Sequence, residues 1–299
     1  MAIKDDIRAK LNSGNPVTRL IIINTVVFLF LSILRIFAFL SGESHFMHSF
    51  ESGVFDNLAI ELSLKGFIHR PWTIITYMFT QLGVQHILWN LIILYSFGEF
   101  LISYAGQRRI IPLYVYGGIS GALLAIGLIY ASPALHPYIG SQLIGASAGV
   151  TAIIVACATL IPNVMMNLPF IGEVKLIYVA IFVIFINVLD VASYSNVGGN
   201  LAHLGGALMG YFFIIQYKKG RDMSEGLNRF FDWFKGLFRS SGKSKMKVVH
   251  KRAVSDEDYN YNRKQEQEQI DRILDKINRS SYDSLTKEEK EILHRASKK

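Results

Sequence analysis

Residues 199–217 read GNLAHLGGALMGYFFIIQY, and this stretch decides the class of fold. It contains no Asp, Glu, Lys or Arg, and it has the length of about 17–25 helical residues that crosses ~30 Å of hydrocarbon. Gly206 and Gly210 follow His203 by three and seven positions, so the three residues lie on one helix face. Small residues at this spacing let two helices approach closely in lipid. The stretch therefore predicts a membrane-spanning helix with a histidine in a tight helix contact.

Five more apolar stretches of spanning length precede this one along the chain. Hydrophobic residues make up 51% of the sequence and charged residues 18%, against about 25% charged in a typical soluble domain. We therefore predict an all-α membrane protein in which six transmembrane helices form a bundle, followed by a short helical C-terminal tail. The five stretches are 20–40, 86–102, 110–130, 143–161 and 174–192.

Basic residues are distributed unevenly along the chain. Residues 1–217 contain 10 Lys+Arg and 9 Asp+Glu, whereas residues 218–299 contain 21 and 14. The connections 131–142 and 193–198 contain no Lys or Arg. Because Lys and Arg bias a connection toward the cytoplasmic side, this pattern predicts that both termini are cytoplasmic. The basic tail has no aromatic or Cys/His framework, which argues against a nucleic-acid binder, and the single cysteine, Cys157, excludes an internal disulfide.

Composition divides the sequence into four segments. Residues 1–19 form an N-terminal cytoplasmic segment, and residues 20–217 form the six-helix domain. In residues 218–239, apolar side chains recur at helical spacing beside Lys and Arg, which predicts an amphipathic helix on the membrane surface. Residues 240–299 form a cytoplasmic linker and a small helical tail.

Helix-start signals mark the segments that follow the bundle. Ser224 stands before the periodic apolar residues of segment 218–239 and is a suitable N-cap. Thr286 and Glu289 have the spacing of a capping box, which predicts a helix from Lys287 to about Ala296. Before it, apolar residues at helical spacing predict a short amphipathic helix. These residues are Ile270, Ile273, Leu274 and Ile277.

Polar residues inside an apolar stretch are costly in a bilayer, so each one needs a reason. The second stretch opens with His86 and Asn90, and the fourth contains Ser147 near its start. In the predicted topology, the second, fourth and sixth helices all run from the outer to the inner side. These three residues and His203 therefore lie at a similar depth just below the outer surface, which indicates a common site.

The residue types at this depth suit nucleophilic catalysis. A serine hydroxyl is a weak nucleophile that needs a base within hydrogen-bond reach, most often histidine. A developing oxyanion needs preorganised donors, which Asn side chains, His N–H groups and backbone amides at a helix amino terminus can supply. Glu99 lies near the inner end of its helix, too far from this level to complete a triad. The chemistry therefore predicts a Ser147–His203 dyad.

Each of these residues also has an ordinary structural explanation. A serine in a membrane helix commonly bonds to its own backbone, and a histidine can be a packing partner. Small residues are common where membrane helices meet, and we assign a packing role to Gly145, Gly149, Gly206 and Gly210.

A transporter or channel is an alternative to an enzyme. Such a protein would need several ionisable residues along a path across the membrane, whereas the polar groups here gather at one level.

Several short motifs occur in order between residues 70 and 217. They are Pro71-Trp72, Thr76-Tyr77-Met78-Phe79, His86-x-x-x-Asn90, Phe97-Gly98, Tyr116-Gly117-Gly118-x-x-Gly121, Gly145-Ala146-Ser147 and Ala202-His203-x-x-Gly206-x-x-x-Gly210. Together they resemble the rhomboid family of intramembrane serine proteases. The resemblance implies that Ser147 is the nucleophile and His203 its general base and later acid. It also implies that His86, Asn90 and the backbone N–H of Ser147 form the oxyanion hole.

The same resemblance implies partners and location. Rhomboid proteases need no metal or cofactor, and their substrates are other membrane proteins, cut in or near their transmembrane segments within the lipid bilayer. Residues 284–290, SLTKEEK, resemble the tail of rhomboids from Bacteroidetes-type bacteria, which implies a multi-pass protein of the bacterial inner membrane. A catalytically inactive rhomboid-like adaptor that binds client membrane proteins is the alternative.

Three positions depart from the family pattern. Ala148 stands where glycine often follows the serine, and Gln81 stands where a histidine often precedes the His86 motif. Thr151 replaces an aromatic residue that in many members packs on the catalytic base. The contact that holds the ring of His203 must therefore come from elsewhere in the chain.

Overall fold

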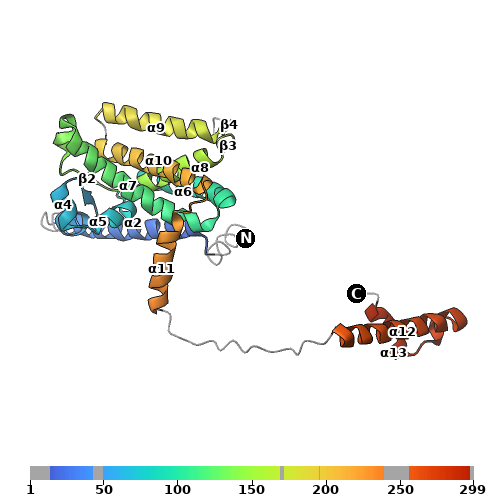
Figure 1. The fold of residues 1–299 in the computed structure, drawn as a ribbon. Helices are drawn as coiled ribbons and strands as arrows, with labels where there is room; N and C mark the ends of the chain where they lie inside the picture. The colour runs from blue at the N-terminus through green and yellow to red at the C-terminus, as the bar shows by residue number, and fades with distance from the viewer. Residues whose placement is uncertain (1–13, 43–49, 169–171, 195, 239–255, 297–299) are drawn as a thin grey trace. The chain divides into compact units, whose positions relative to one another are not determined.

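The computed structural model describes residues 14–42, 50–168, 172–194, 196–238 and 256–296 (Figure 1). The chain divides into two compact units, Met1–Phe238 and Arg239–Lys299. The first unit contains all of the long apolar helices, and each unit is described by itself.

One helix stands at each of the six predicted apolar stretches, and the predicted all-α class is confirmed. Three stretches, Pro16–Leu40, Val84–Ala105 and Gln107–Ala131, are long and apolar enough to cross a membrane, and two shorter helices, Ser147–Leu160 and Leu176–Ala192, are also apolar. The count of six crossings stays a prediction. The helices are α2 (Pro16–Leu40), α6 (Val84–Ala105), α7 (Ile110–Ala131), α8 (Ser147–Leu160), α9 (Leu176–Ala192) and α10 (Val197–Lys218).

Short elements connect these helices. Between α2 and α6 lie the π-helix η1 (Phe50–Phe55), β1 (Ile60–Glu61), α4 (Leu64–His69), α5 (Thr73–Thr76) and η2 (Tyr77–Phe79). The later connections contain η3 (Gln107–Arg109), η4 (Pro133–Tyr138), β2 (Gln142–Leu143), β3 (Met165–Leu168) and β4 (Gly172–Lys175). The strands form two antiparallel pairs, β1 with β2 and β3 with β4.

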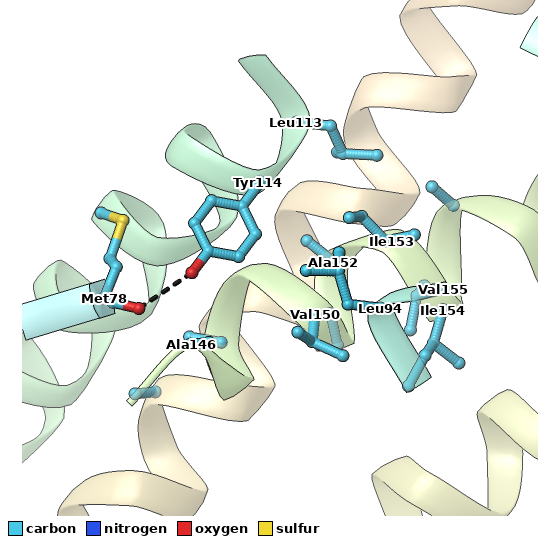
Figure 2. Packing of buried hydrophobic residues seen from close by; sticks show 14 of the residues in the cluster. Met78, Leu94, Leu113, Tyr114, Ala146, Val150, Ala152, Ile153, Ile154 and Val155 are labelled. Carbon is cyan, nitrogen blue, oxygen red and sulfur yellow. Dashed lines mark hydrogen bonds between the residues drawn. The ribbon is translucent and has the colours of Figure 1, made fainter. Parts of the chain in front are cut away.

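Helix α8 occupies the centre of the first unit. Figure 1 shows α2 and α9 on opposite sides of the unit, with α7, α8 and α10 between them. Every residue of α8 from Ala148 to Ala158 is buried. In Figure 2 the side chains of α8 gather with Leu94 of α6 and Leu113 of α7. The core is therefore built around a helix of small and β-branched residues that long neighbouring helices enclose.

The start of α8 differs from the predicted stretch 143–161. Leu143 pairs with Ile60 in the β1–β2 ladder, and the helix begins only at Ser147. Between them, Gly145 has φ +120° and donates its N–H to the carbonyl of Tyr77 at 2.9 Å. A φ in this region strains any residue with a side chain. The apolar stretch was therefore predicted too long, because part of it pairs with a strand from a distant segment.

Glycines allow α10 to pack directly against the backbone of α8. A methyl group on Gly206 would overlap the carbonyl oxygen of Ala148, and one on Gly210 would overlap that of Ala152. On α7, a methyl group on Gly121 would lie 2.6 Å from the carbonyl oxygen of Ala202. Close backbone approach of this kind is how membrane helices gain packing without large apolar side chains.

The outer helices expose large apolar side chains. On α2, Phe30 and Phe37 are 59% and 67% exposed, and on α9 Phe182 and Phe185 are 63% and 56% exposed. Exposed large apolar side chains in such number are unusual on a soluble protein and are typical of helices that face lipid. The first unit therefore has the surface of a multi-pass membrane protein.

Helix α11 (Ser224–Phe238) follows α10 after a short turn and is attached to the α6–α7 turn by polar contacts. Arg109 donates to Asp222 at 2.5 Å, and Asn228 donates to the carbonyl of Arg108 at 3.0 Å. Ser224 was predicted as the N-cap, but it is the first helical residue, and Asp222 accepts from its N–H and its hydroxyl. In Figure 1, α11 runs across the direction of α2 and α10.

Asp222 makes the attachment of α11 dependent on pH. Its partial burial alone would raise the pKa of the carboxyl group, but hydrogen bonds from Ser224 and the charge and hydrogen bond of Arg109 outweigh it and lower the pKa. A lowered pKa means that the folded state favours the carboxylate form of Asp222. The contribution of this carboxylate to the attachment of α11 is therefore present at neutral pH and is lost as the pH falls through the lowered pKa.

We expect Asp222→Asn to make α11 as mobile at neutral pH as this helix is in the unmodified chain at acidic pH. A spin label at Gly236→Cys would report the mobility of the helix, since Cys157 is buried and reacts slowly. Asp232→Asn is the matched control, because the Asp232–Arg108 pair spans 3.5 Å between exposed side chains and such pairs contribute little. Equal label mobility in both variants and the parent would contradict this role of Asp222.

The second unit is a small helical hairpin. It contains α12 (Asp256–Ser280), η5 (Tyr282–Ser284) and α13 (Lys287–Ala296). The predicted capping box is confirmed: Thr286 N–H donates to the Glu289 carboxylate at 2.7 Å, and Glu289 N–H donates to Thr286 Oγ1 at 3.3 Å. Lys276 of α12 also bonds Glu289, which lowers the pKa of that carboxyl group. The predicted short amphipathic helix is longer than expected, because it extends through the polar residues before Ile270.

Candidate active site

Ser147 is the first residue of α8 and sits where the chain turns into the helix. The β2 strand and the positive φ of Gly145 set the direction of approach. A methyl group on Gly149 would lie 2.7 Å from the carbonyl oxygen of Tyr114, so α8 also begins against α7. The backbone N–H of Ser147 belongs to the first turn of a helix, where amides lack intrahelical partners.

His203 of α10 faces this serine. Its Nε2 lies 2.6 Å from Ser147 Oγ, within hydrogen-bond distance. The two residues are 56 positions apart in the sequence. The contact depends on the glycine packing described above, because Gly206 lies one helical turn after His203 and brings α10 onto the start of α8.

The other ring nitrogen of His203 contacts Asn187 of α9. His203 Nδ1 lies 2.5 Å from Asn187 Oδ1, and Asn187 Nδ2 donates to the carbonyl of Val183 at 2.7 Å. Asn187 is one of three buried residues on α9, together with Leu176 and Ala180. A chain of hydrogen bonds therefore runs from α9 through His203 to Ser147.

His86 and Asn90 lie on the first turns of α6. A methyl group on Gly145 would lie 2.8 Å from His86 Cε1 and 3.5 Å from Ser147 Oγ, so both side chains border the same glycine. Asn90 is 6% exposed and donates through Nδ2 to Gln81 Oε1 at 3.0 Å. An amide nitrogen carries two hydrogens, so this bond leaves Asn90 a second donor.

A buried polar network fixes Asn90 in turn. Gln81 Nε2 donates to Asn24 Oδ1 at 2.9 Å, and Asn24 Nδ2 donates to the carbonyl of Leu20 at 2.9 Å. Gln81 and Asn24 are both fully buried. Tyr114 hydroxyl, which also borders Asn24, donates to the carbonyl of Met78 at 2.8 Å (Figure 2). Because every bond has a defined direction, the network orients the amide of Asn90.

This arrangement can carry out acyl transfer. It contains an alcohol bonded to an imidazole, a third group on the far side of that imidazole, and the ring of His86, which borders the same glycine as the alcohol. Within the residues that the structure describes, no group of three His, Cys, Asp or Glu side chains forms a cluster that could hold a metal ion.

Comparison with known proteins agrees with the motif pattern. The rhomboid domain family matches residues 69–219, half of the chain. The chain belongs to the rhomboid family. Over 167 residues it is 29% identical to RHOMBOID-like protein 12, mitochondrial, of Arabidopsis thaliana, covering 51% of this chain and 48% of that protein. Over 154 residues it is 35% identical to Rhomboid-related protein 1 of Caenorhabditis elegans, covering 48% and 39%.

The match includes Ser147, His203, His86 and Asn90 but leaves Asn24 and both ends of the chain outside it. The chain spans less than half the length of these relatives. The second unit has a separate match, since residues 255–299 fit a family of unknown function, DUF6576. Both relatives are eukaryotic, so the Bacteroidetes-type tail and the bacterial membrane stay predictions.

Two residues that the fold brings to the site, or to the network behind Asn90, were not predicted from the sequence. They are Asn187 of α9, a polar residue near the end of an apolar stretch, and Asn24 of α2. Two signals were available: Asn187 is a polar residue in an apolar stretch, and the replacement of an aromatic residue by Thr151 requires that another group hold His203. Thr151 itself is buried within α8, and Asn187 makes the contact to the ring.

Proposed function

We propose that this rhomboid protein is an intramembrane serine endopeptidase that hydrolyses peptide bonds in or near the transmembrane segments of other membrane proteins. The observation that carries the proposal is the 2.6 Å contact between Ser147 Oγ and His203 Nε2. A serine with a packing role alone would normally bond to a backbone carbonyl of its own helix, as Ser96 and Ser103 of α6 do.

Acylation begins with a proton transfer within the dyad. Ser147 Oγ attacks the carbonyl carbon of the scissile bond while its proton moves to His203 Nε2. The tetrahedral intermediate carries a negative charge on the former carbonyl oxygen. His203 then gives its proton to the leaving amine, the C–N bond breaks, and the new amino terminus departs.

The oxyanion is held by donors around Gly145. We assign this role to the backbone N–H of Ser147, the second Nδ2 hydrogen of Asn90 and a ring N–H of His86. Each such donor typically contributes about 10²–10³-fold to the rate of an acyl transfer. The Asn24–Gln81–Asn90 network supports this assignment, because it fixes one Asn90 hydrogen elsewhere and leaves the other for the site.

Deacylation repeats these steps with water as nucleophile. His203 takes a proton from water, the hydroxide attacks the acyl-enzyme ester, and Ser147 Oγ leaves with the proton that His203 returns. The substrate helix must unwind locally, since a peptide bond inside a helix is shielded. Glycine or proline near the cut lowers the cost of unwinding, because both residues are poor helix formers.

The decisive experiment is covalent labelling with a fluorophosphonate probe. Such probes react with a serine that a neighbouring base activates, so we expect labelling of the unmodified chain at Ser147 and loss of labelling in Ser147→Ala and His203→Ala. If the purified, folded chain does not react and cleaves no model transmembrane substrate, the inactive adaptor that binds client proteins becomes the better assignment.

We further propose that the chain lies in a bacterial inner membrane with both termini in the cytoplasm and the site near the outer face. Helix α11 would then lie on the inner surface of the bilayer. Its Phe230, Trp233 and Leu237 are 53%, 61% and 61% exposed, and aromatic side chains favour the membrane interface. Reporter fusions after residues 140 and 299 test the orientation: only the first should respond as an extracytoplasmic site.

A further inference from the structure

We infer that Asn187 is a positioning residue that fixes the tautomer and orientation of His203, so that the site operates as a Ser147–His203–Asn187 triad. This inference rests on the proposed serine protease function and adds a component to it. It begins from the two hydrogen bonds that Asn187 makes, one to the backbone of α9 and one to the histidine.

The backbone contact decides which end of the amide faces the ring. A carbonyl oxygen can only accept hydrogen bonds, so the group of Asn187 that lies 2.7 Å from the carbonyl of Val183 must be its NH₂. Val183 precedes Asn187 by one helical turn, so this bond is local and does not depend on α10. It leaves Oδ1 of Asn187 directed at His203.

The amide oxygen in turn decides where His203 carries its proton. Oδ1 accepts and cannot donate, so a contact of 2.5 Å requires a hydrogen on His203 Nδ1. Neutral imidazole has only one N–H. Nε2 therefore presents its lone pair to Ser147 Oγ at 2.6 Å, which is the state that a general base needs. With the opposite tautomer, an N–H would point at the hydroxyl and no base would be available.

An amide suits this place better than a carboxylate. Asn187 is buried on an apolar helix, and a charged group inside a membrane is costly unless it is paired. Asn187 supplies the acceptor without a net charge, and it still accepts from Nδ1 after His203 becomes protonated during catalysis. The same division of roles occurs in cysteine proteases that use Cys, His and Asn.

Asn187→Leu tests the role, because it keeps a similar volume and removes the acceptor. We expect kcat for a transmembrane substrate to fall by at least about 10-fold, with KM changed less than about 2-fold. Asn187→Asp and Asn187→Gln retain an acceptor, and we expect at least one of them to keep more activity than Asn187→Leu. Val188→Ala, at an exposed position of the same helix, is the matched control and should match the unmodified chain.

A measurement that does not depend on activity separates this inference from the proposed function. In the full chain labelled with ¹⁵N-histidine, the signals of His203 are identified by their loss in His203→Ala. We expect the Nδ1–H form in the unmodified chain and a mixture or the Nε2–H form in Asn187→Leu. An unchanged tautomer and unchanged kcat in a folded Asn187→Leu would overturn the inference, even if Ser147→Ala abolishes cleavage. A changed tautomer in a chain that cleaves nothing would support the positioning role and overturn the protease assignment.

Discussion

Replacing Ser147 by alanine is expected to lower the rate of cleavage of a transmembrane substrate by at least about 10³-fold, and replacing His203 by alanine is expected to lower it to the same extent. The reason is that the two groups act as one unit: without the imidazole the alcohol at 2.6 Å keeps its proton, and without the alcohol the base has nothing to activate. Losses from such a unit are not additive. The double variant should therefore be no slower than either single variant.

The measurement is cleavage by purified protein in proteoliposomes, with matched substitutions as controls. Ser96→Ala removes a serine that only bonds to the carbonyl of Ile92 in its own helix. His136→Ala removes an exposed histidine of η4. Both controls should retain full activity. Cleavage by Ser147→Ala at more than about a tenth of the parent rate would show that another group is the nucleophile.

The positions of Ser147 and His203 could be predicted because they depend on short-range patterns. Both fall in apolar stretches where a polar residue needs a reason, and Gly206 and Gly210 follow His203 on the same face. A predicted topology then gives both residues the same depth. These arguments need only the fixed rise of a helix and a predicted number of crossings, which follows from the positions of the apolar stretches.

Asn187 is also a polar residue in an apolar stretch, but its partner could not be predicted, because the contact depends on how α9 is rotated about its own axis. Nearly every position of α9 is apolar, so the sequence does not indicate which face meets α10. The start of α8 escaped prediction for a related reason. Leu143 fits an apolar helix by composition, but it pairs with Ile60, and no local pattern reveals a partner so far away in the chain.

The hydrogen-bond network around Asn90 could be predicted only in part. Gln81 stands where the family often has a histidine, and its polar side chain could be recognised from the sequence as a departure from the family pattern. Its partner Asn24 sits on α2, where most positions are at least partly exposed, and only the fold reveals that Asn24 is among the few buried residues of this helix. A single polar residue within an apolar helix indicates a contact with another polar group, but the sequence does not show which residue the partner is.

Gly210→Val is expected to destabilise the first unit by about 3 kcal/mol or more, the largest effect on stability that we anticipate for a single residue outside the site. A side chain at this position would overlap the carbonyl group of Ala152, and α8 cannot move away because it is enclosed on all sides. The helices α8 and α10 must therefore separate or shift along each other. Since His203 lies on the same face of α10, activity should fall together with stability.

Cys157 provides the measurement for this variant, because it is the single cysteine and is fully buried on α8. A thiol-reactive fluorophore will label it only when the bundle opens, so the labelling midpoint on heating reports unfolding. Gly127→Val is the matched control: Gly127 lies on α7, and a methyl group there would have no neighbour within 4 Å. We expect the midpoint of Gly127→Val to stay near that of the parent and that of Gly210→Val to fall clearly. If both variants melt with the parent, α10 does not depend on close approach to α8, and the contact that brings His203 to Ser147 must be maintained by other residues.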